Sequence, residues 1–190
     1  MNKRIFISAL GLSMLTVAAA PAWADSYQNT VKAFAKAEES GKIAKNAYGY
    51  AVFPTIGKAG IGIGGAYGKG RVYEQGKYIG NTSMTQVSVG FQLGGQGFSQ
   101  IIYFEDQAAL KTFTKGEFEF GAEASAVAIT AGAGAKTSTT GSSAQISGDR
   151  DNAKSVGAYN HGMAVFTLPH GGLMYEATVS GQKFNYKKKK

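Results

Sequence analysis

The chain has 190 residues, of which 27 are glycine, and a formal net charge of +8. It contains no cysteine, which excludes disulfide bonds, a lipid-modified N-terminal cysteine and a cysteine nucleophile. This length suits one domain with its own core, and so much glycine beside 10 tyrosines and 11 phenylalanines is typical of a sheet protein with many turns.

The N-terminal segment has the order of a secretory signal peptide. Lys3 and Arg4 precede an apolar run, Ile5–Ala20, and a small-residue triplet, Ala22–Ala24, follows. The run has 16 residues, fewer than the ~20 that a membrane-spanning helix needs. We therefore predict cleavage after Ala24 and a location in the periplasm or outside the cell. Residues 25–186 then form the domain, and the basic residues 187–190 form a disordered tail.

Ser26–Ala47 is predicted to be helical, because Tyr27, Val31 and Phe34 fall on one stripe at helical spacing. We expect Ser40-Gly41 to divide this segment into two helices and Gly49 to end the second.

Strands are expected to dominate the remainder of the domain. The clearest is Met84–Leu93, where apolar and polar residues alternate with a period of two. Gln75-Gly76 and Gly94-Gly95 are expected turns. The expected strands are Tyr50–Thr55, Ala59–Tyr67, Arg71–Tyr78 with its internal turn, Met84–Leu93, Phe98–Phe104, Glu117–Ala131, Met163–Leu168 and Leu173–Ser180, the last continuing through Phe184 and Tyr186.

One short helix interrupts these strands, with Asp106 as its N-cap and Gly116 at its end. Gly132–Lys154 is rich in Gly, Ser, Thr and Asp and is expected to be mainly loop. We predict a single α+β domain with a large, mostly antiparallel, glycine-rich β-sheet, N-terminal helices and one short inter-strand helix. The glycines make a curved or barrel-like sheet plausible.

Gly60, Gly62 and Gly65 spell G-x-G-x-x-G, the spacing of a dinucleotide-binding loop. That motif needs a helix after the glycines and an acidic residue about 20 positions further on. Gly68 and Gly70 disfavour such a helix, and no acid stands at the required distance. We therefore predict no nucleotide binding. In a strand Gly60, Gly62 and Gly64 would share one bare face, which another layer, such as the N-terminal helix, could approach closely.

The sequence offers little for catalysis. It has no G-x-S-x-G or S-x-x-K motif, and its histidines, His161 and His170, stand in turn-like contexts. Glu117, Glu119 and Glu123 share one strand face, which we interpret as a solvated face. We predict that the protein is not an enzyme and holds no metal or cofactor.

Charge is unevenly distributed along the chain. Basic residues dominate from Ser40 to Gly80, where Glu74 is their one acidic counterpart, and acids dominate from Ile101 to Ser125. This asymmetry predicts a basic surface that meets anionic partners, although a merely solubilising surface is the alternative. Export and the absence of a recognition motif disfavour nucleic acid. The candidate binding residues are Lys32, Lys36, Lys42, Lys45, Lys58, Lys69, Arg71 and Lys77.

Several long motifs resemble the SYLF domain family in the same order. They are "GYAVFP" (Gly49–Pro54), "KAGIGIGGAYGKG" (Lys58–Gly70), "SMTQVSVGFQLGGQ" (Ser83–Gln96), "FEFGAEASAVA" (Phe118–Ala128) and "GLMYEATVSGQKF" (Gly172–Phe184). The resemblance implies a non-enzymatic lipid-binding module. Eukaryotic members are associated with phosphoinositide membranes and actin, and membrane contact is attributed to an amphipathic N-terminal helix and basic residues. The nearest counterparts in this chain are Tyr27, Val31 and Phe34, with Lys32 and Lys36 beside them.

Three hypotheses remain open at this point, of which an enzyme built from the acidic and histidine residues has the smallest share. The leading hypothesis is an exported module that binds anionic phospholipid surfaces peripherally through its basic residues. The alternative is an envelope-structural or protein-interaction module that does not touch lipid and forms a homo-oligomer through exposed sheet surface.

Overall fold

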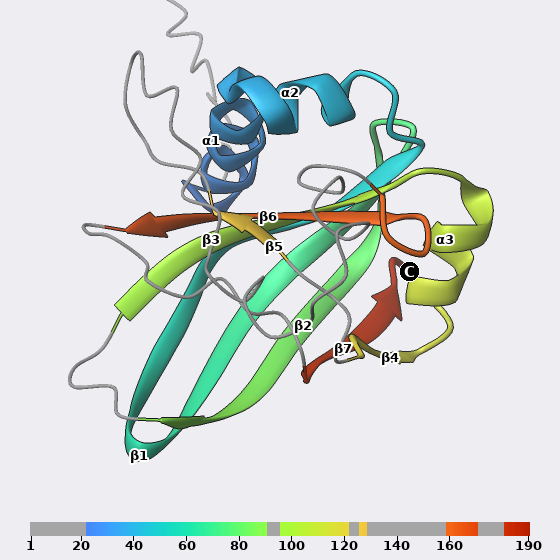
Figure 1. The fold of residues 1–190 in the computed structure, drawn as a ribbon. Helices are drawn as coiled ribbons and strands as arrows, with labels where there is room; N and C mark the ends of the chain where they lie inside the picture. Colours follow the sequence, from blue (N-terminus) through green and yellow to red (C-terminus); the bar gives the residue numbers. More distant parts are fainter. Residues whose placement is uncertain (1–21, 91–95, 122–125, 129–158, 171–180) are drawn as a thin grey trace, which may run out of the picture.

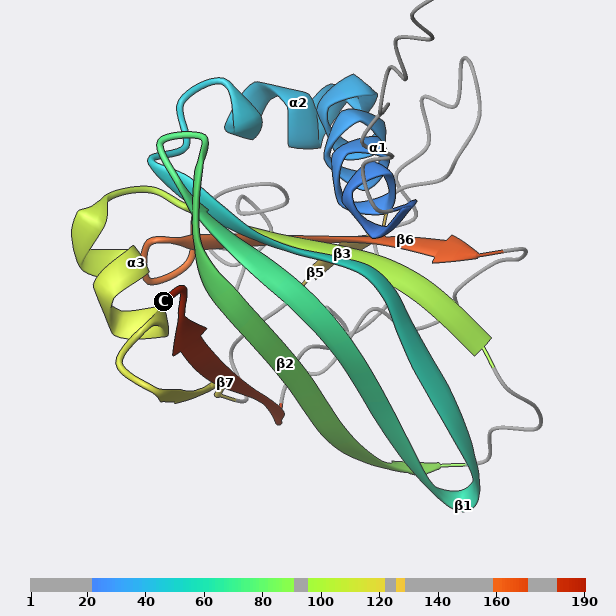
Figure 2. The same ribbon diagram turned by 180° about the vertical axis from the view of Figure 1, so that it is seen from behind.

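The protein folds as an α+β domain around one large, mostly antiparallel sheet, as predicted (Figure 1). The computed structural model describes residues 22–90, 96–121, 126–128, 159–170 and 181–190. Seven strands stand in the order β4-β7-β2-β1-β3-β6-β5, so the described sheet is open rather than a closed barrel. Helices α1 and α2 cover one face, and α3 lies at one end, near β4 and β7 (Figures 1 and 2).

The N-terminal helices are α1, Ala22–Lys36, and α2, Glu38–Ala44. The break falls at Ala37, whose backbone is extended, and not at the expected Ser40-Gly41. Gly41 lies inside α2, where a Cβ atom would come within 2.5 Å of the Ala35 carbonyl oxygen. That glycine therefore allows the two helices to meet closely. Gly49 does not end the helix, because it is the first residue of β1.

Strand β1, Gly49–Glu74, doubles back on itself as a long hairpin (Figures 1 and 2). In a straight strand Tyr50 and Tyr73 would lie roughly 75 Å apart, at ~3.3 Å per residue. Their ring centroids are instead 4.9 Å apart. The bend falls between Lys58, which pairs with β3, and Gly62, which pairs with β2. The strands that were expected separately before Gln75 are thus the two arms of one element. The G-x-G-x-x-G glycines lie within β1 and are followed by more strand, not by a helix.

The other central strands agree well with the sequence. The Gln75-Gly76 turn has positive φ at both residues and leads into β2, Lys77–Gly90. Strand β3, Gln96–Phe104, pairs with the first arm of β1 and with β6, Met163–His170. Helix α3, Gln107–Phe113, is capped as predicted, since the Asp106 carboxylate accepts a 2.8 Å hydrogen bond from the Ala109 amide.

Two expectations at the sheet edges were wrong. Glu117–Ala131 is not one strand: β4, Glu117–Glu119, pairs with β7, whereas β5, Ala126–Ala128, pairs with β6 at the opposite edge. The lysine tail is not disordered, because β7, Gln182–Lys188, pairs with β2 as far as Lys188. The expected Gly94-Gly95 turn, the Gly132–Lys154 loop and the Leu173–Ser180 strand lie outside the described residues.

The two faces of the sheet carry different cores. We call the face that carries Phe53, Phe104 and Phe184 the inner face, and α3 packs there through Leu110 and Phe113. The sheet curls toward this face, because the amides of Gln100 on β3 and Gln182 on β7 meet at 2.8 Å although β1 and β2 lie between their strands. The opposite, outer face carries the helices.

Further along the second arm of β1, Gly68 and Gly70 leave a bare surface, which side chains of the first arm occupy. A Cβ atom on Gly70 would lie 2.6 Å from the Phe53 ring, and one on Gly68 would lie 2.5 Å from the Ile56 side chain. The expected partner, the N-terminal helix, packs on the outer face instead. The side chains of residues 59–63, which include Gly60 and Gly62, lie outside what the structure describes.

Candidate anion-binding surface

A ladder of aromatic rings crosses the outer face at the end nearest the helices. It begins with Phe166 on β6 and Tyr103 on β3, whose centroids are 5.9 Å apart. It continues through Tyr50 and Tyr73 on the two arms of β1 and ends at Tyr78 on β2, 5.8 Å from Tyr73. Aromatic and β-branched residues in neighbouring strands stabilise a sheet through such cross-strand contacts.

Helices α1 and α2 cover much of this ladder. Phe34 is fully buried, and Tyr27 and Val31 pack against the same cluster, so the apolar stripe of α1 faces the sheet and not the solvent. Ser40 on α2 is also buried, with its hydroxyl 3.3 Å from that of Tyr103. Burial raises the pKa of the Tyr50 hydroxyl to about 12, so this group remains protonated at neutral pH.

Cations gather around the last ring of the ladder. The Arg71 guanidinium lies 4.3 Å from the centroid of Tyr27 on α1 and 5.3 Å from that of Tyr78. The ammonium group of Lys189 also lies 5.3 Å from the Tyr78 centroid. Arg71 is opposite Asn81, and Asn81 is opposite Lys187, so the two cationic residues lie ~10 Å apart across three neighbouring strands. We call Arg71, Tyr78, Lys187 and Lys189 the Tyr78 cluster.

Of these four residues only Arg71 was among the predicted binding residues. The C-terminal lysines were expected to add attraction, but as a disordered tail and not as part of the sheet. The signal was present in "QKFNYK", where Gln182, Phe184 and Tyr186 alternate with polar residues as in a strand. The Lys189 amide also donates a 2.9 Å hydrogen bond to the Ile79 carbonyl oxygen, which fixes the segment beside β2.

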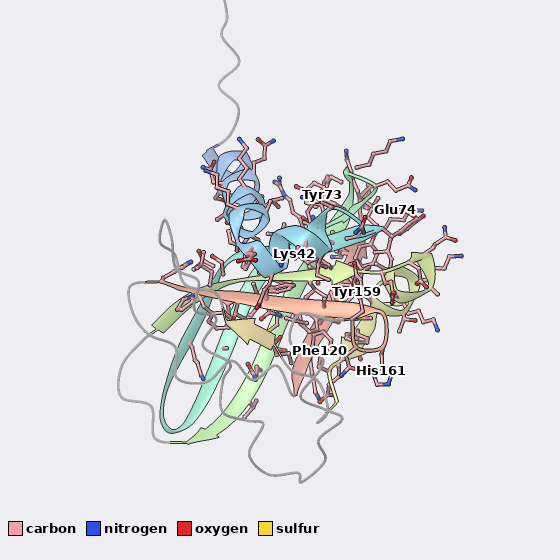
Figure 3. The ribbon with its side chains drawn as sticks, turned by 45° about the horizontal axis from the view of Figure 1, so that its top comes forward. Lys42, Tyr73, Glu74, Phe120, Tyr159 and His161 are labelled. Carbon is pink, nitrogen blue, oxygen red and sulfur yellow. The ribbon has the colours of Figure 1, made fainter. Side chains whose placement is uncertain are left out.

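The predicted cations do not form one patch. Lys32 and Lys36 are exposed on α1. Lys42, labelled in Figure 3, lies on α2 and pairs with Glu38 at 3.1 Å. Lys45 follows just after this helix. Lys69 and Arg71 lie on the outer face of β1, and Lys77 follows the hairpin turn. Lys58 is at the bend, at the other end of the hairpin. The structure therefore joins Arg71 to the C-terminal lysines and separates Lys58 from them.

Other candidate chemical groups offer no reactive arrangement. The described residues include no group of three His, Cys, Asp or Glu side chains that could hold a metal ion. Glu117 and Glu119 are exposed, as expected, whereas Glu123 lies outside the described range. His161 occupies a turn, and His170 is the last residue of β6. The Ser99 hydroxyl is 2.7 Å from His170 Nε2, but it donates its hydrogen to the Pro54 carbonyl oxygen, also at 2.7 Å.

The helices of the described chain are too short or too polar to cross a bilayer. The fold and the described surface define an α+β domain whose basic and aromatic groups converge on one face of its sheet. The chain belongs to the Ysc84 family, whose family model is described as "Las17-binding protein actin regulator" and matches residues 85–189. This is the SYLF family that the motifs resemble, and it is a family of binding and regulatory domains.

One curated relative is Beta cell expansion factor A from Aeromonas veronii. It is 28% identical to this chain over 149 residues, which cover 73% of the chain. The match covers 45% of the relative, so the chain spans less than half of that protein.

Proposed function

We propose that this protein is an exported, non-enzymatic module that binds anionic phospholipid surfaces peripherally. In this proposal the signal peptide is removed after Ala24 and the domain acts in the periplasm or outside the cell. Family membership supports a binding role, and the charge distribution supports an anionic partner.

The observation that carries the proposal is the Tyr78 cluster. Arg71 on β1 and Lys189, just after β7, both lie over the Tyr78 ring, and Lys187 lies on the same row of the sheet as Arg71. Lys42 pairs with Glu38 and Lys183 pairs with Glu119, and neither of these ion pairs involves the cluster. Each cation near an anionic bilayer contributes about 1 kcal/mol, so the cluster and its neighbours Lys69 and Lys77 supply useful attraction.

Vesicle co-sedimentation tests the proposal. Binding should require phosphatidylglycerol and should weaken as salt rises, because salt screens the attraction between exposed charges. Equal binding to pure phosphatidylcholine vesicles, or no binding at low salt, would contradict it.

A matched pair of variants tests the cluster itself. Lys187→Gln/Lys189→Gln should weaken vesicle binding by about tenfold or more, from the ~1 kcal/mol that each cation contributes. Lys111→Gln/Lys115→Gln removes the same charge from exposed lysines on and just after α3, and should change affinity by less than about threefold. Equal losses in the two variants would mean that net charge alone controls binding. The variant Lys32→Gln/Lys36→Gln then measures how much the exposed lysines of α1 contribute to vesicle binding.

A protein-interaction or envelope-structural role is the second candidate, favoured by the description of the matching family model, which names a protein partner. Light scattering of lipid-free protein and cross-linking in cell envelopes test it. Stable assemblies without lipid, together with no affinity for anionic vesicles, would support this role over lipid binding.

A further inference from the structure

The part of the outer face near the β1 bend is left uncovered by the helices. Figures 1 and 2 show α1 and α2 over one end of the sheet and the β1 bend projecting at the other. Tyr67 and Val87 are the large apolar side chains exposed among the described residues, with exposed fractions of 51% and 76%. They lie together on neighbouring strands, since Tyr67 pairs with Thr85 and Val87 pairs with Gly65.

Cations border this apolar pair on the same face. Arg71, Lys69 and Tyr67 follow one another at every second position of β1, so their side chains project to the same side and run from basic to apolar toward the bend. Lys183 on β7 is level with Tyr67 in the sheet, because Thr85 on β2 lies between them and pairs with both. The acids that the described strands place on this face are Glu117 and Glu119 on the edge strand β4, where Glu119 pairs with Lys183 at 3.5 Å.

The exposed tyrosine and valine lie closer to the bend than Lys69 and Arg71, so apolar and cationic groups follow one another in the order of the acyl chains and headgroups of an anionic bilayer. Tyrosine favours the membrane–water interface, where its ring contacts acyl chains and its hydroxyl meets headgroups. Lysine and arginine one or two rows away would then lie at the level of the lipid phosphates. Contiguous exposed apolar groups with a polar rim are typical of a membrane or protein contact.

Resting on the proposed function, we propose that the domain docks with the β1 bend toward the bilayer, and that Tyr67 and Val87 enter the interface as anchors. Helices α1 and α2 stay on the sheet in this orientation, with the Tyr27–Val31–Phe34 stripe still buried. Lys69 and the Tyr78 cluster provide the electrostatic attraction, and the apolar pair provides the penetration.

Because the chain has no cysteine, single cysteines can report which surface meets the lipid. Val87→Cys, Lys36→Cys on α1 and Thr112→Cys on α3 would each carry an environment-sensitive fluorophore. They are mixed with vesicles of phosphatidylglycerol and phosphatidylcholine in equal amounts. We expect emission at position 87 to rise at least about twofold and to be quenched by a nitroxide on the lipid chains, with little change at positions 36 and 112.

Unlabelled variants supply a second measurement. Tyr67→Ser and Val87→Ser should each weaken vesicle binding by about threefold to tenfold, from the apolar area that they remove. Thr85→Ser, an exposed change between them, is the matched control and should have little effect.

The possible outcomes separate this orientation from lipid binding itself. A response at position 36 but not at 87, with binding intact, overturns the orientation and leaves the proposed function standing. Absence of binding to these vesicles at low salt overturns both. If Val87→Ser instead abolishes lipid-free self-association and leaves vesicle binding unchanged, the apolar pair is a contact between copies of the chain, and this inference fails.

Discussion

The inner and outer faces of the same sheet are built from different kinds of aromatic residue. The inner face is a phenylalanine cluster, in which Phe184 lies 5.2 to 6.2 Å from four other phenylalanine rings, closed by a pair of buried glutamines. The outer face carries tyrosines with cations stacked on them. Tyrosine combines an apolar ring with a polar hydroxyl, so it suits a face that is part core and part surface. The difference agrees with a structural role for the inner face, and it places the proposed lipid contact on the outer face.

The largest expected effect tests the role of the inner face. Phe184→Ala should lower the free energy of unfolding by about 3–5 kcal/mol, because the cavity forms among rings that cannot collapse into it. Tyr67→Ala on the outer face removes an aromatic ring that is half exposed and should cost less than about 0.5 kcal/mol. Urea denaturation followed by circular dichroism measures both. Similar losses would show that the two faces do not differ in this way.

The glutamine pair gives the next largest effect. Gln100 and Gln182 are fully buried and exchange two amide hydrogen bonds, of 2.8 and 3.1 Å. Gln182→Leu leaves the Gln100 amide without this partner and should cost about 1–3 kcal/mol. The double variant Gln100→Leu/Gln182→Leu removes both groups and should cost less than the sum of the single changes. Strict additivity in urea denaturation would mean that the two amides are not coupled.

The folded protein should lose stability in alkaline solution because of Tyr50 on the outer face. Burial raises the pKa of Tyr50 to about 12, above the ordinary value near 10. The folded state therefore holds this proton more tightly than the unfolded state. Its contribution to stability is complete below pH ~10 and is lost as the pH rises through about 12.

Denaturation midpoints measured between neutral pH and pH ~11.5 test this dependence. Tyr50→Phe should flatten the alkaline decline, since it removes the titrating hydroxyl. An unchanged decline in that variant would assign the dependence to other groups, among which Tyr103 also has a pKa raised by burial.

The smallest expected effect separates stability from binding on the outer face. Arg71→Gln removes the cation that stacks on Tyr27 and Tyr78, and should cost about 0.5–1 kcal/mol of stability. Its effect on vesicle binding should be proportionally larger, because the same charge serves the proposed lipid contact. Lys69→Gln is the control for stability, since Lys69 is exposed two residues away. A loss of several kcal/mol at Arg71 would make it mainly a structural residue.

Much of the secondary structure could be predicted, because local patterns specify it. The Gln75-Gly76 turn and the Asp106 cap each correspond to a feature of the structure. Residues 84–90 of the expected strand Met84–Leu93 lie in β2, but Gln86 is buried there and Val87 is exposed, the reverse of what its apolar alternation predicts. The predictions were wrong where contacts with distant segments decide where an element ends or what it pairs with. The helix break at Ala37 depends on how α1 and α2 meet, and the Glu117–Ala131 pattern could not reveal that its two ends join opposite edges of the sheet.

The candidate site was predicted only in part. Arg71 and Lys69 were identified from their charge, but their neighbours Lys187 and Lys189 come from the other end of the chain. The apolar pair of Tyr67 and Val87 had no signature in the sequence, because a strand residue's exposure depends on which helix covers its face.

The sequence by itself determined the α+β class, the family and the excess of basic charge, because these follow from local periodicity, motif order and composition. Tertiary structure alone decided that β1 doubles back, that Lys187 and Lys189 lie near Arg71 and that helix α1 covers tyrosines rather than glycines. The physical reason is that hydrogen bonding along a strand is satisfied by residues far away in the chain, and that burial is a property of the packed layers and not of any one segment.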